Sequence, residues 1–137
     1  MTPPRRLNVA SGRQLESLAH YSRALRVGDT VLQSGTTAID RQGHVHGEGD
    51  VATQVEAIMK IAAWSMGKAG GRLDDVVRSR IYVTDIAVGD AAARAIAHYF
   101  RDARPAATLV QVSGLARPQQ LVEIGRASCR ERVLTDV

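Results

Sequence analysis

A single carboxylate stands in an apolar run near the carboxyl end of the chain. Glu123 lies between Val122 and Ile124 in the stretch LVEI. Carboxylates are rarely buried without a partner, because removing a charge from water is costly. Either Glu123 forms an ion pair with an arginine at a subunit interface, or it belongs to a functional site. Both interpretations make it the first candidate residue.

A second group of polar residues has the types that bind metals. His44, His46, Glu48 and Asp50 alternate in the stretch HVHGEGD, so an extended backbone would bring them to one edge. The glycines around them favour a solvent-exposed loop instead, and nothing else in the chain supplies the supporting residues that metal ligands need. We therefore expect no metal site here.

The stretch VVRSRIYVTD predicts a half-polar strand over residues 76–85. One face carries Val77, Ser79, Ile81 and Val83, and the other carries Arg78, Arg80, Tyr82 and Thr84. With Leu109 and Gln111 of a later strand, the second face is too apolar for water and too charged for a sealed core. Such a face is typical of a subunit interface with a wet cleft, so we expect a homo-oligomer.

Hydrophobic periodicity and turn residues predict the elements that must position these residues. In chain order they are a hairpin (21–35) that turns at Gly28, a polar loop (36–50), a helix from Asp50 to Gly70-Gly71, the strand at 76–85, a short helix (89–102) and two strands (107–112 and 120–124). Two helices on one face of a sheet of about four to six strands make an α+β fold.

Composition limits the kind of protein. The chain has 137 residues, 45% of them hydrophobic, so we expect it to form one domain. The formal charge of +4 is scattered rather than clustered, which argues against nucleic-acid binding. No stretch approaches the roughly 20 apolar residues of a membrane span, and Cys129 is the single cysteine. We expect a cytoplasmic protein with neither a disulfide nor a cysteine-based zinc site.

Four stretches of this sequence resemble one known family. HYSRALRVGDTVLQSG, AGGRLDDVVRSRIYVTD, RPAATLVQV and LVEI occur in the order seen in the YjgF or Rid (reactive intermediate deaminase) family, and span residues 18–124. The resemblance implies a homotrimer with a chorismate-mutase-like fold, in which two helices cover one face of a mostly antiparallel or mixed sheet of about six strands. It also implies hydrolysis of small enamines and imines, such as 2-aminoacrylate, to ketoacids and ammonia, as a form of metabolite damage control.

The resemblance assigns roles to individual residues of an intersubunit cleft. Tyr21 would line the cleft, Ser34 and Gly35 would offer hydroxyl or backbone hydrogen bonds, and Glu123 would position or deprotonate the attacking water. No cofactor or metal is implied. The partners expected are a small imine, enamine or keto acid and further copies of the chain, without nucleic acid or membrane.

One position departs from the deaminase pattern. Where that branch has Pro-Ala-Arg-Ser, with the arginine on the substrate carboxylate, this chain has Pro105-Ala106-Ala107-Thr108. Losing such a pair costs roughly 1.5 to 3 kcal/mol, enough to change the substrate. Arg80 is a candidate replacement, unless it forms an intersubunit salt bridge. The alternative function is a non-catalytic trimer that binds metabolites or protects other proteins.

The pattern of the last strand changes after Ile124. The stretch GRASCRERV has no alternation and little β propensity, so we predict that the strand ends at Ile124 and that the tail packs poorly. EIGRASCRERV is also the one-frame translation of a common sequencing adapter. We therefore expect a single domain over residues 1–124 and a non-native tail over residues 125–137.

Overall fold

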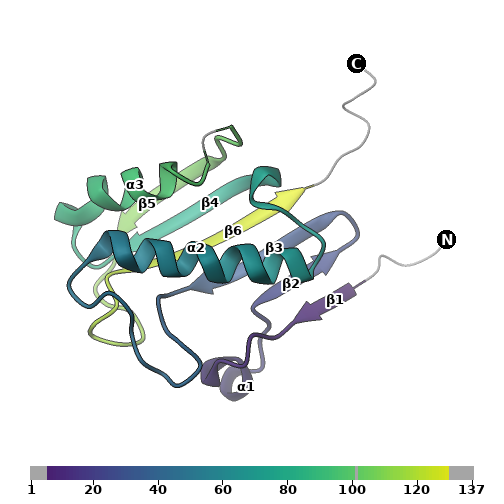
Figure 1. Cartoon of the computed structure of the whole chain (residues 1–137), viewed down its shortest axis with the longest axis horizontal. Coiled ribbons are helices and arrows are strands. Elements are labelled where there is room, and N and C mark those ends of the chain that lie inside the picture. The colour runs from purple at the N-terminus through teal and green to yellow at the C-terminus, as the bar shows by residue number, and fades with distance from the viewer. Residues whose placement is uncertain (1–5, 101, 130–137) are drawn as a thin grey trace.

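The structure is a computed structural model that describes residues 6–100 and 102–129 (Figure 1). A six-stranded mixed sheet has the order β1-β2-β3-β6-β4-β5. The strands are β1 (Arg6–Val9), β2 (Ala24–Val27), β3 (Thr30–Thr36), β4 (Val76–Val83), β5 (Ala106–Gln111) and β6 (Val122–Cys129). The helices are α1 (Gln14–Ala19), α2 (Val51–Lys68) and α3 (Gly89–Ala97), with short 3-10 turns at Leu73–Asp75 and Ile86–Val88.

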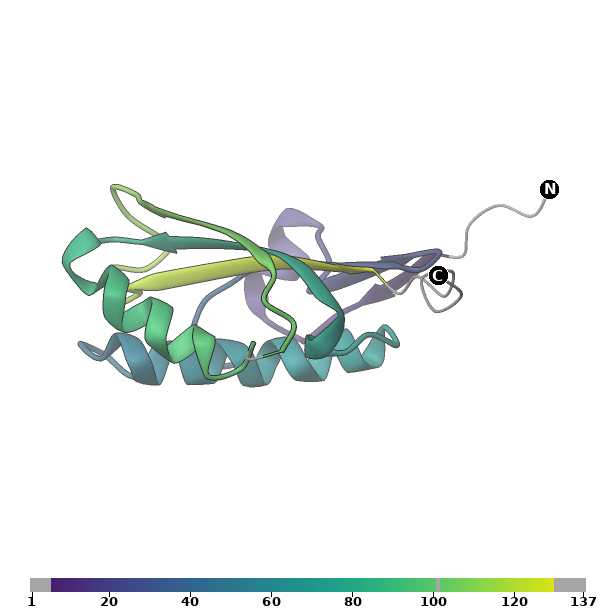
Figure 2. The same ribbon diagram turned by 90° about the horizontal axis from the view of Figure 1, so that it is seen from above.

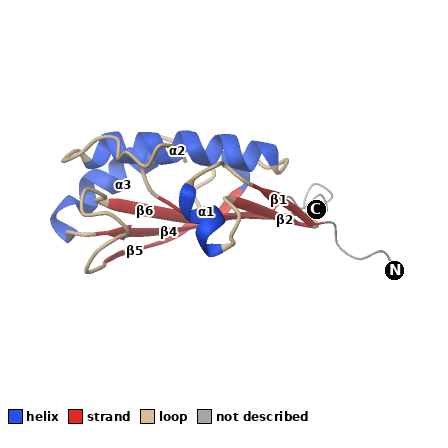
Figure 3. Ribbon diagram, turned by 90° about the horizontal axis from the view of Figure 1, so that it is seen from below, coloured by secondary structure: helices blue, strands red, loops and turns tan. Residues whose placement is uncertain are grey.

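Two helices cover one face of the sheet and leave the other face open. Seen edge-on, α2 and α3 lie together on the same side of the strands (Figure 2). The short helix α1 lies apart from them, at the level of the strands (Figure 3). This arrangement confirms the predicted α+β architecture. Within the described ranges, no helix has the length and apolar character needed to cross a membrane.

The predicted hairpin and first helix form for the expected reasons. Gly28 adopts a positive φ of 58° in the turn between β2 and β3, which a side chain would disfavour. Asp50 caps α2 by accepting a hydrogen bond from the Thr53 amide. The apolar stripe of α2 is fully buried against the sheet at Val55, Ile58, Ala62 and Met66.

The second helix is shorter than predicted. It ends at Ala97 rather than near residue 102, because the next amides bond three residues back: Tyr99 to Ile96 and Phe100 to Ala97. These bonds tighten the chain into turns before Pro105. Residue 101 lies outside the described residues. The helix connects β4 to β5, which pair in parallel.

The last strand lies in the middle of the sheet. β6 pairs antiparallel with both β3 and β4, and its backbone has partners on both sides at Ile124, Arg126, Ala127 and Ser128. Val122 and Ile124 are fully buried beneath the helices. Because side chains alternate along a strand, Glu123 points to the open face.

Three sequence predictions about strands are wrong. Leu109 and Gln111 do not lie on the open face, because Leu109 pairs with the buried Ile81 and packs against the core; Val110, next to Tyr82, takes the open face instead. β6 does not end at Ile124 but continues to Cys129, because pairing with strands on both sides holds the backbone whatever its β propensity. Residues 130–137, the rest of the predicted tail, lie outside the described residues. In β4 a register shift between Val76 and Arg78 turns Val77 outward, where it is 52% exposed, and Val76 takes its place in the core.

Candidate functional site

Glu123 lies near the start of β6, the strand in the middle of the sheet, and faces the open side. It is half-buried and lies directly opposite Tyr82 of the neighbouring strand β4. Burial raises the pKa of the Glu123 carboxyl, and the positive charge of Arg23 partly opposes that effect. A carboxyl with a raised pKa exchanges its proton closer to neutral pH than an exposed one, which suits acid-base chemistry.

A break in the pairing of β3 brings the backbone of Gly35 against this carboxyl. The register with β6 shifts between Gln33 and Thr36, next to Glu123. A Cβ on residue 35 would stand 2.6 Å from the Oε2 atom of Glu123, closer than real atoms approach. The carboxylate therefore occupies space that only a glycine leaves free. β-bulges commonly re-aim side chains beside active sites in this way.

The larger pocket at this place lies on the open face of the sheet, and we refer to it as the open-face pocket. Its volume is about 450 Å³, within the range of small-molecule sites. Arg78 and Arg80 of β4 line it together with Tyr82, Gly35 and Glu123. The buried Arg126 lines it as well, so three cations share one concave surface with the candidate base, an arrangement that suits an anionic metabolite.

A smaller pocket, the end pocket, lies near α1. It has a volume of about 60 Å³, and its lining includes Tyr21, Arg23, Arg117, Gly35 and Glu123. Gly35 and Glu123 also line the open-face pocket, so they form the common wall of the two. A volume of this size accommodates a few water molecules or one small polar group.

The structure brings together four of the residues predicted for the site. Tyr21, Gly35 and Glu123 meet at the end pocket, and Arg80 joins Gly35 and Glu123 at the open-face pocket. Ser34 lies beside them but its hydroxyl donates to the Ser22 carbonyl at 2.6 Å, so that hydroxyl is already engaged within the chain.

Two other predicted residues lie farther away within the chain. Ala107 and Thr108 belong to the edge strand β5, which is two strands from β6 and hence about 10 Å across the sheet. Thr108 shares a separate pocket of about 260 Å³ with Arg80. Position 107 is therefore separated from Glu123 of the same chain by the full width of β4.

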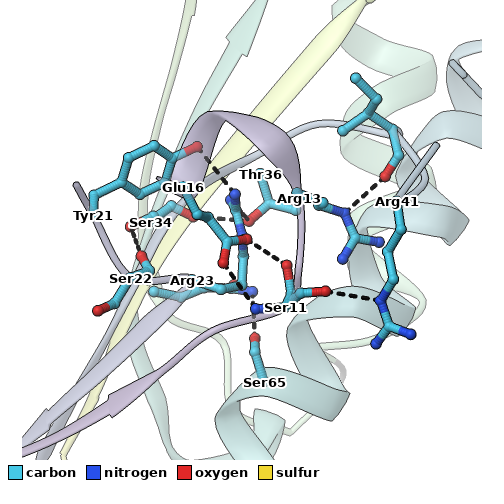
Figure 4. A network of polar contacts seen from close by, with 12 residues as sticks. Ser11, Arg13, Glu16, Tyr21, Ser22, Arg23, Ser34, Thr36, Arg41 and Ser65 are labelled. Carbon is cyan, nitrogen blue, oxygen red and sulfur yellow. Dashed lines mark hydrogen bonds and ion pairs between the residues drawn. The ribbon is translucent and has the colours of Figure 1, made fainter. Parts of the chain in front are cut away.

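Sequence reasoning missed a buried polar network behind the site (Figure 4). Arg23 is only 4% exposed and forms a 3.1 Å ion pair with Glu16, which is 5% exposed. Neither residue was singled out, because helix α1 is too short to show a periodic pattern. The one available signal was Arg23 itself, a charged residue immediately after the Tyr21-Ser22 pair.

The histidines of the polar loop contact a carboxylate that was not in the predicted set. The Nε2 atom of His46 lies 3.2 Å from Asp40 Oδ2, and the Nδ1 atom of His44 lies 3.7 Å from the same oxygen. In the described part of the chain, no three histidine, cysteine or acidic residues come together as a metal site.

Comparison with known proteins identifies the family. The sequence profile of the family described as endoribonuclease L-PSP matches residues 11–128. The chain belongs to this family. It is 36% identical over 107 residues to the 3-aminoacrylate deaminase RutC of Acinetobacter baylyi, an alignment that covers 78% of this chain and 84% of RutC. A RutC family protein of Sulfurisphaera tokodaii is 31% identical over 104 residues, covering 76% of this chain and 82% of its own.

Solved structures agree with this assignment. A Mycobacterium tuberculosis member of the YjgF/YER057c/UK114 family superposes with a TM-score of 0.84 at 37% identity, covering 92% of this chain and 100% of its own. A Pseudomonas aeruginosa protein of unknown function gives 0.77 at 34% identity, with 94% of each chain covered. The resemblance to the YjgF/Rid family drawn from the sequence is thereby confirmed.

Proposed function

We propose that this Rid-family protein is a hydrolytic deaminase of small enamines and imines of the 2-aminoacrylate type, acting in the cytoplasm as metabolite damage control. The observation that carries the proposal is the half-buried Glu123 carboxyl, whose pKa is raised, in the wall of a 450 Å³ pocket lined by arginines. The identity with RutC, named as a 3-aminoacrylate deaminase, supports the same reaction class.

The reaction needs one group that both accepts and donates a proton. An enamine first tautomerises to its imine, and water then adds to the carbon of the protonated C=N bond. Glu123 takes a proton from that water as the C–O bond forms, and returns it to the nitrogen. The C–N bond breaks as the C=O bond forms, releasing ammonia and a keto acid. The steps need no oxidant, reductant or cofactor.

Arg80 is the residue we propose for the substrate carboxylate in place of the arginine missing at Ala107. It lies on β4 opposite Gly125 and is a diagonal neighbour of Glu123, so their backbones are about 7 to 8 Å apart and their Cβ atoms somewhat closer. The structure shows no hydrogen bond or ion pair of the Arg80 side chain with any described residue, so its N–H groups remain available. Both side chains line the open-face pocket.

We further propose that the protein is a homotrimer whose cleft lies between subunits. The open face exposes large side chains, among them Leu32 at 46% and Val110 at 41%, beside the charged Arg78 and Arg80. The edge strand β5 bears Ala107 and Thr108 far from Glu123 of the same chain. A neighbouring subunit seated on the open face would both cover these side chains and bring its own β5 towards this site.

The activity in the family's description, cleavage of RNA, has less support in the site. RNA cleavage by proton transfer relies most often on histidine. None of the four histidines of the chain lines either pocket beside Glu123 in the described residues. An RNA substrate belongs in the assay only as a comparison.

The test couples this protein to an enzyme that generates imines, with semicarbazide present to trap them. The parent protein should slow semicarbazone formation, and Glu123→Gln should lose about a hundredfold or more of that rate. Glu56→Gln is the matched control, because Glu56 is an exposed carboxylate on α2 paired with Lys60. If the parent protein does not slow semicarbazone formation from any of the imines tested, the non-catalytic binding trimer becomes the better interpretation.

A further inference from the structure

The buried Arg23 donates hydrogen bonds to Tyr21 and to the end of β3 beside the candidate site (Figure 4). Its Nε donates to Glu16, its Nη1 to the Gly35 carbonyl at 3.0 Å and to Thr36 Oγ1 at 3.2 Å, and its Nη2 to the Tyr21 hydroxyl at 3.1 Å. A guanidinium has five N–H donors, and four are used here. Arg23 therefore has little capacity left to bind a substrate.

Glu16 holds this guanidinium in place. Burial alone would raise the pKa of Glu16, but hydrogen bonds from the side chain and amide of Ser11, together with Arg23, outweigh burial and lower it. The carboxylate stays ionised at neutral pH, so the ion pair persists. Glu16 binds the Nε atom of Arg23, and Gly35, Thr36 and Tyr21 bind its Nη atoms, so the guanidinium is held in a single orientation.

Two of the four groups that Arg23 bonds, Gly35 and Tyr21, line the site together with Glu123. The Gly35 backbone is the segment that leaves room for the Glu123 carboxylate. Tyr21 lines the end pocket with Glu123, and the Arg23 guanidinium also lies 5.4 Å from the centre of its ring. A displacement of Arg23 would therefore move both the backbone and the aromatic wall of the site.

Arg23 also supplies a fixed positive charge near the carboxylate. It is the cation whose charge opposes the effect of burial on the pKa of Glu123. The other titratable side chains that line the two pockets are Arg13, Tyr21, Asp40 and Arg117 at the end pocket, and Arg78, Arg80, Tyr82 and Arg126 at the open-face pocket. Among all of these, only Arg23 combines that electrostatic effect with direct bonds to Gly35 and Tyr21.

We propose that Arg23 is the positioning residue of the deaminase site, where it fixes the Gly35 backbone and the Tyr21 hydroxyl around Glu123 without contacting the substrate. The inference rests on the proposed function, since it gives Glu123 the catalytic role. On this inference, the arginines of the site have different roles. Arg23 positions the groups around Glu123, and another residue binds the substrate carboxylate.

The first experiment follows the Glu123 carboxyl by carbon NMR in the parent, in Arg23→Gln and in the control Arg26→Gln. Like Arg23, Arg26 precedes the turn at Gly28, and it donates to the backbone carbonyls of Gly28 and Ala69. It lines neither pocket. Removing the charge at position 23 should raise the Glu123 pKa further, because Arg23 opposes the effect of burial, and Arg26→Gln should leave it unchanged. A folded Arg23→Gln variant with an unchanged Glu123 titration would overturn the proposal.

The second experiment uses Arg23→Lys, which keeps the charge but has too few, differently placed donors to reach all four partners. Its Glu123 titration should stay close to that of the parent, while kcat falls about tenfold or more and KM changes little. If Arg23→Gln does not fold, this variant decides: parental kcat overturns the proposal. If Arg23→Gln shifts the Glu123 titration but the parent protein itself has no deaminase activity, the proposed function is refuted. The role of Arg23 in positioning the groups around Glu123 then still holds.

Discussion

The carboxylate of Glu123 lies in the space that a side chain on residue 35 would fill. A Cβ at position 35 would come within 2.6 Å of Oε2 and 3.0 Å of Cδ of Glu123. β3 has no side chain at residue 35, and the Glu123 carboxylate of the neighbouring strand β6 lies over the Gly35 backbone. The position of the candidate base is therefore set by a residue that has no side chain.

Gly35→Ala should displace the Glu123 carboxylate and leave the fold intact. The atoms that a methyl group would meet are the end of a flexible side chain, so Glu123 can rotate away with little cost in stability. We expect kcat/KM to fall about tenfold to a hundredfold, with a small change in Tm. Gly114→Ala is the control, because no atom lies within 4 Å of a Cβ built there. Full activity in Gly35→Ala would contradict this account of the site.

The deaminase rate should depend on pH through Glu123. Burial raises the pKa of this carboxyl above its ordinary value of 4.5, and the reaction needs it ionised when water attacks. The rate should therefore fall as pH decreases through the raised pKa, at a higher pH than for an exposed glutamate. A kcat/KM profile between pH 4 and 9 measures this limb. A profile with no acidic limb above the ordinary value would exclude Glu123 as the base.

The stability of the fold should depend on pH through Glu16, whose pKa is lowered, whereas that of Glu123 is raised. Its pKa is lower in the folded state than the ordinary value of 4.5, so the unfolded chain binds the proton more tightly. The stabilisation is fully present above the unfolded pKa and is lost as pH falls through the folded pKa. Thermal unfolding between pH 2 and 7 should show this loss in the parent.

Glu16→Gln should remove that acid dependence and lower stability at neutral pH. Removing one partner of a buried ion pair costs about 3 to 5 kcal/mol, because Arg23 is left without a counter-charge. Denaturant unfolding at pH 7 measures the difference from the parent. Parental stability in Glu16→Gln would show that the pair contributes nothing to the fold.

Arg80→Ala should raise KM for carboxylate-bearing substrates and change kcat little. A charge-assisted pair with a carboxylate contributes roughly 1.5 to 3 kcal/mol, so KM should rise about tenfold or more. Arg94→Ala on the exposed face of α3 is the matched control. An unchanged KM in Arg80→Ala would leave the arginine missing at Ala107 without a replacement in this chain.

Arg126 should be a site where an apolar substitution increases stability. It is 4% exposed, its Nε and Nη1 have no hydrogen-bond partner in the described residues, and burial lowers its pKa to about 10. Its neighbours are the Met59 sulfur at 3.3 Å and the Phe100 ring. Arg126→Met should raise the free energy of unfolding by about 2 kcal/mol, as denaturant unfolding would show. A loss of stability would reveal a partner for this guanidinium.

The same residue bears on the predicted non-native tail. Alternation along β6 places residues 122, 124, 126 and 128 under the helices, and the first two are apolar while the last two are Arg126 and Ser128. We propose that the codons from residue 125 onward derive from a sequencing adapter, and that the natural strand carries apolar residues at these positions. Genomic sequencing across GRASCRERV checks this directly, since codons continuous with the gene would refute it.

Local sequence signals predicted the elements that form from their own periodicity. The hairpin at Gly28 and the apolar stripe of α2 depend on residues close together in the chain. The Glu16–Arg23 pair and the strand β1 could not be predicted, because they depend on partners that only the folded sheet brings near. The end of β6 was misjudged for the same reason, since two neighbouring strands outweigh weak β propensity.

The order of the sheet also has a consequence for synthesis of the chain. Strands β1 to β3 and strands β4 to β5 meet only through β6, which is the last described strand to leave the ribosome. The two halves of the sheet, and the pockets around Glu123, therefore cannot close while the nascent chain still lacks this segment. Until then β3 and β4 each present an unpaired strand edge, which can pair with another chain.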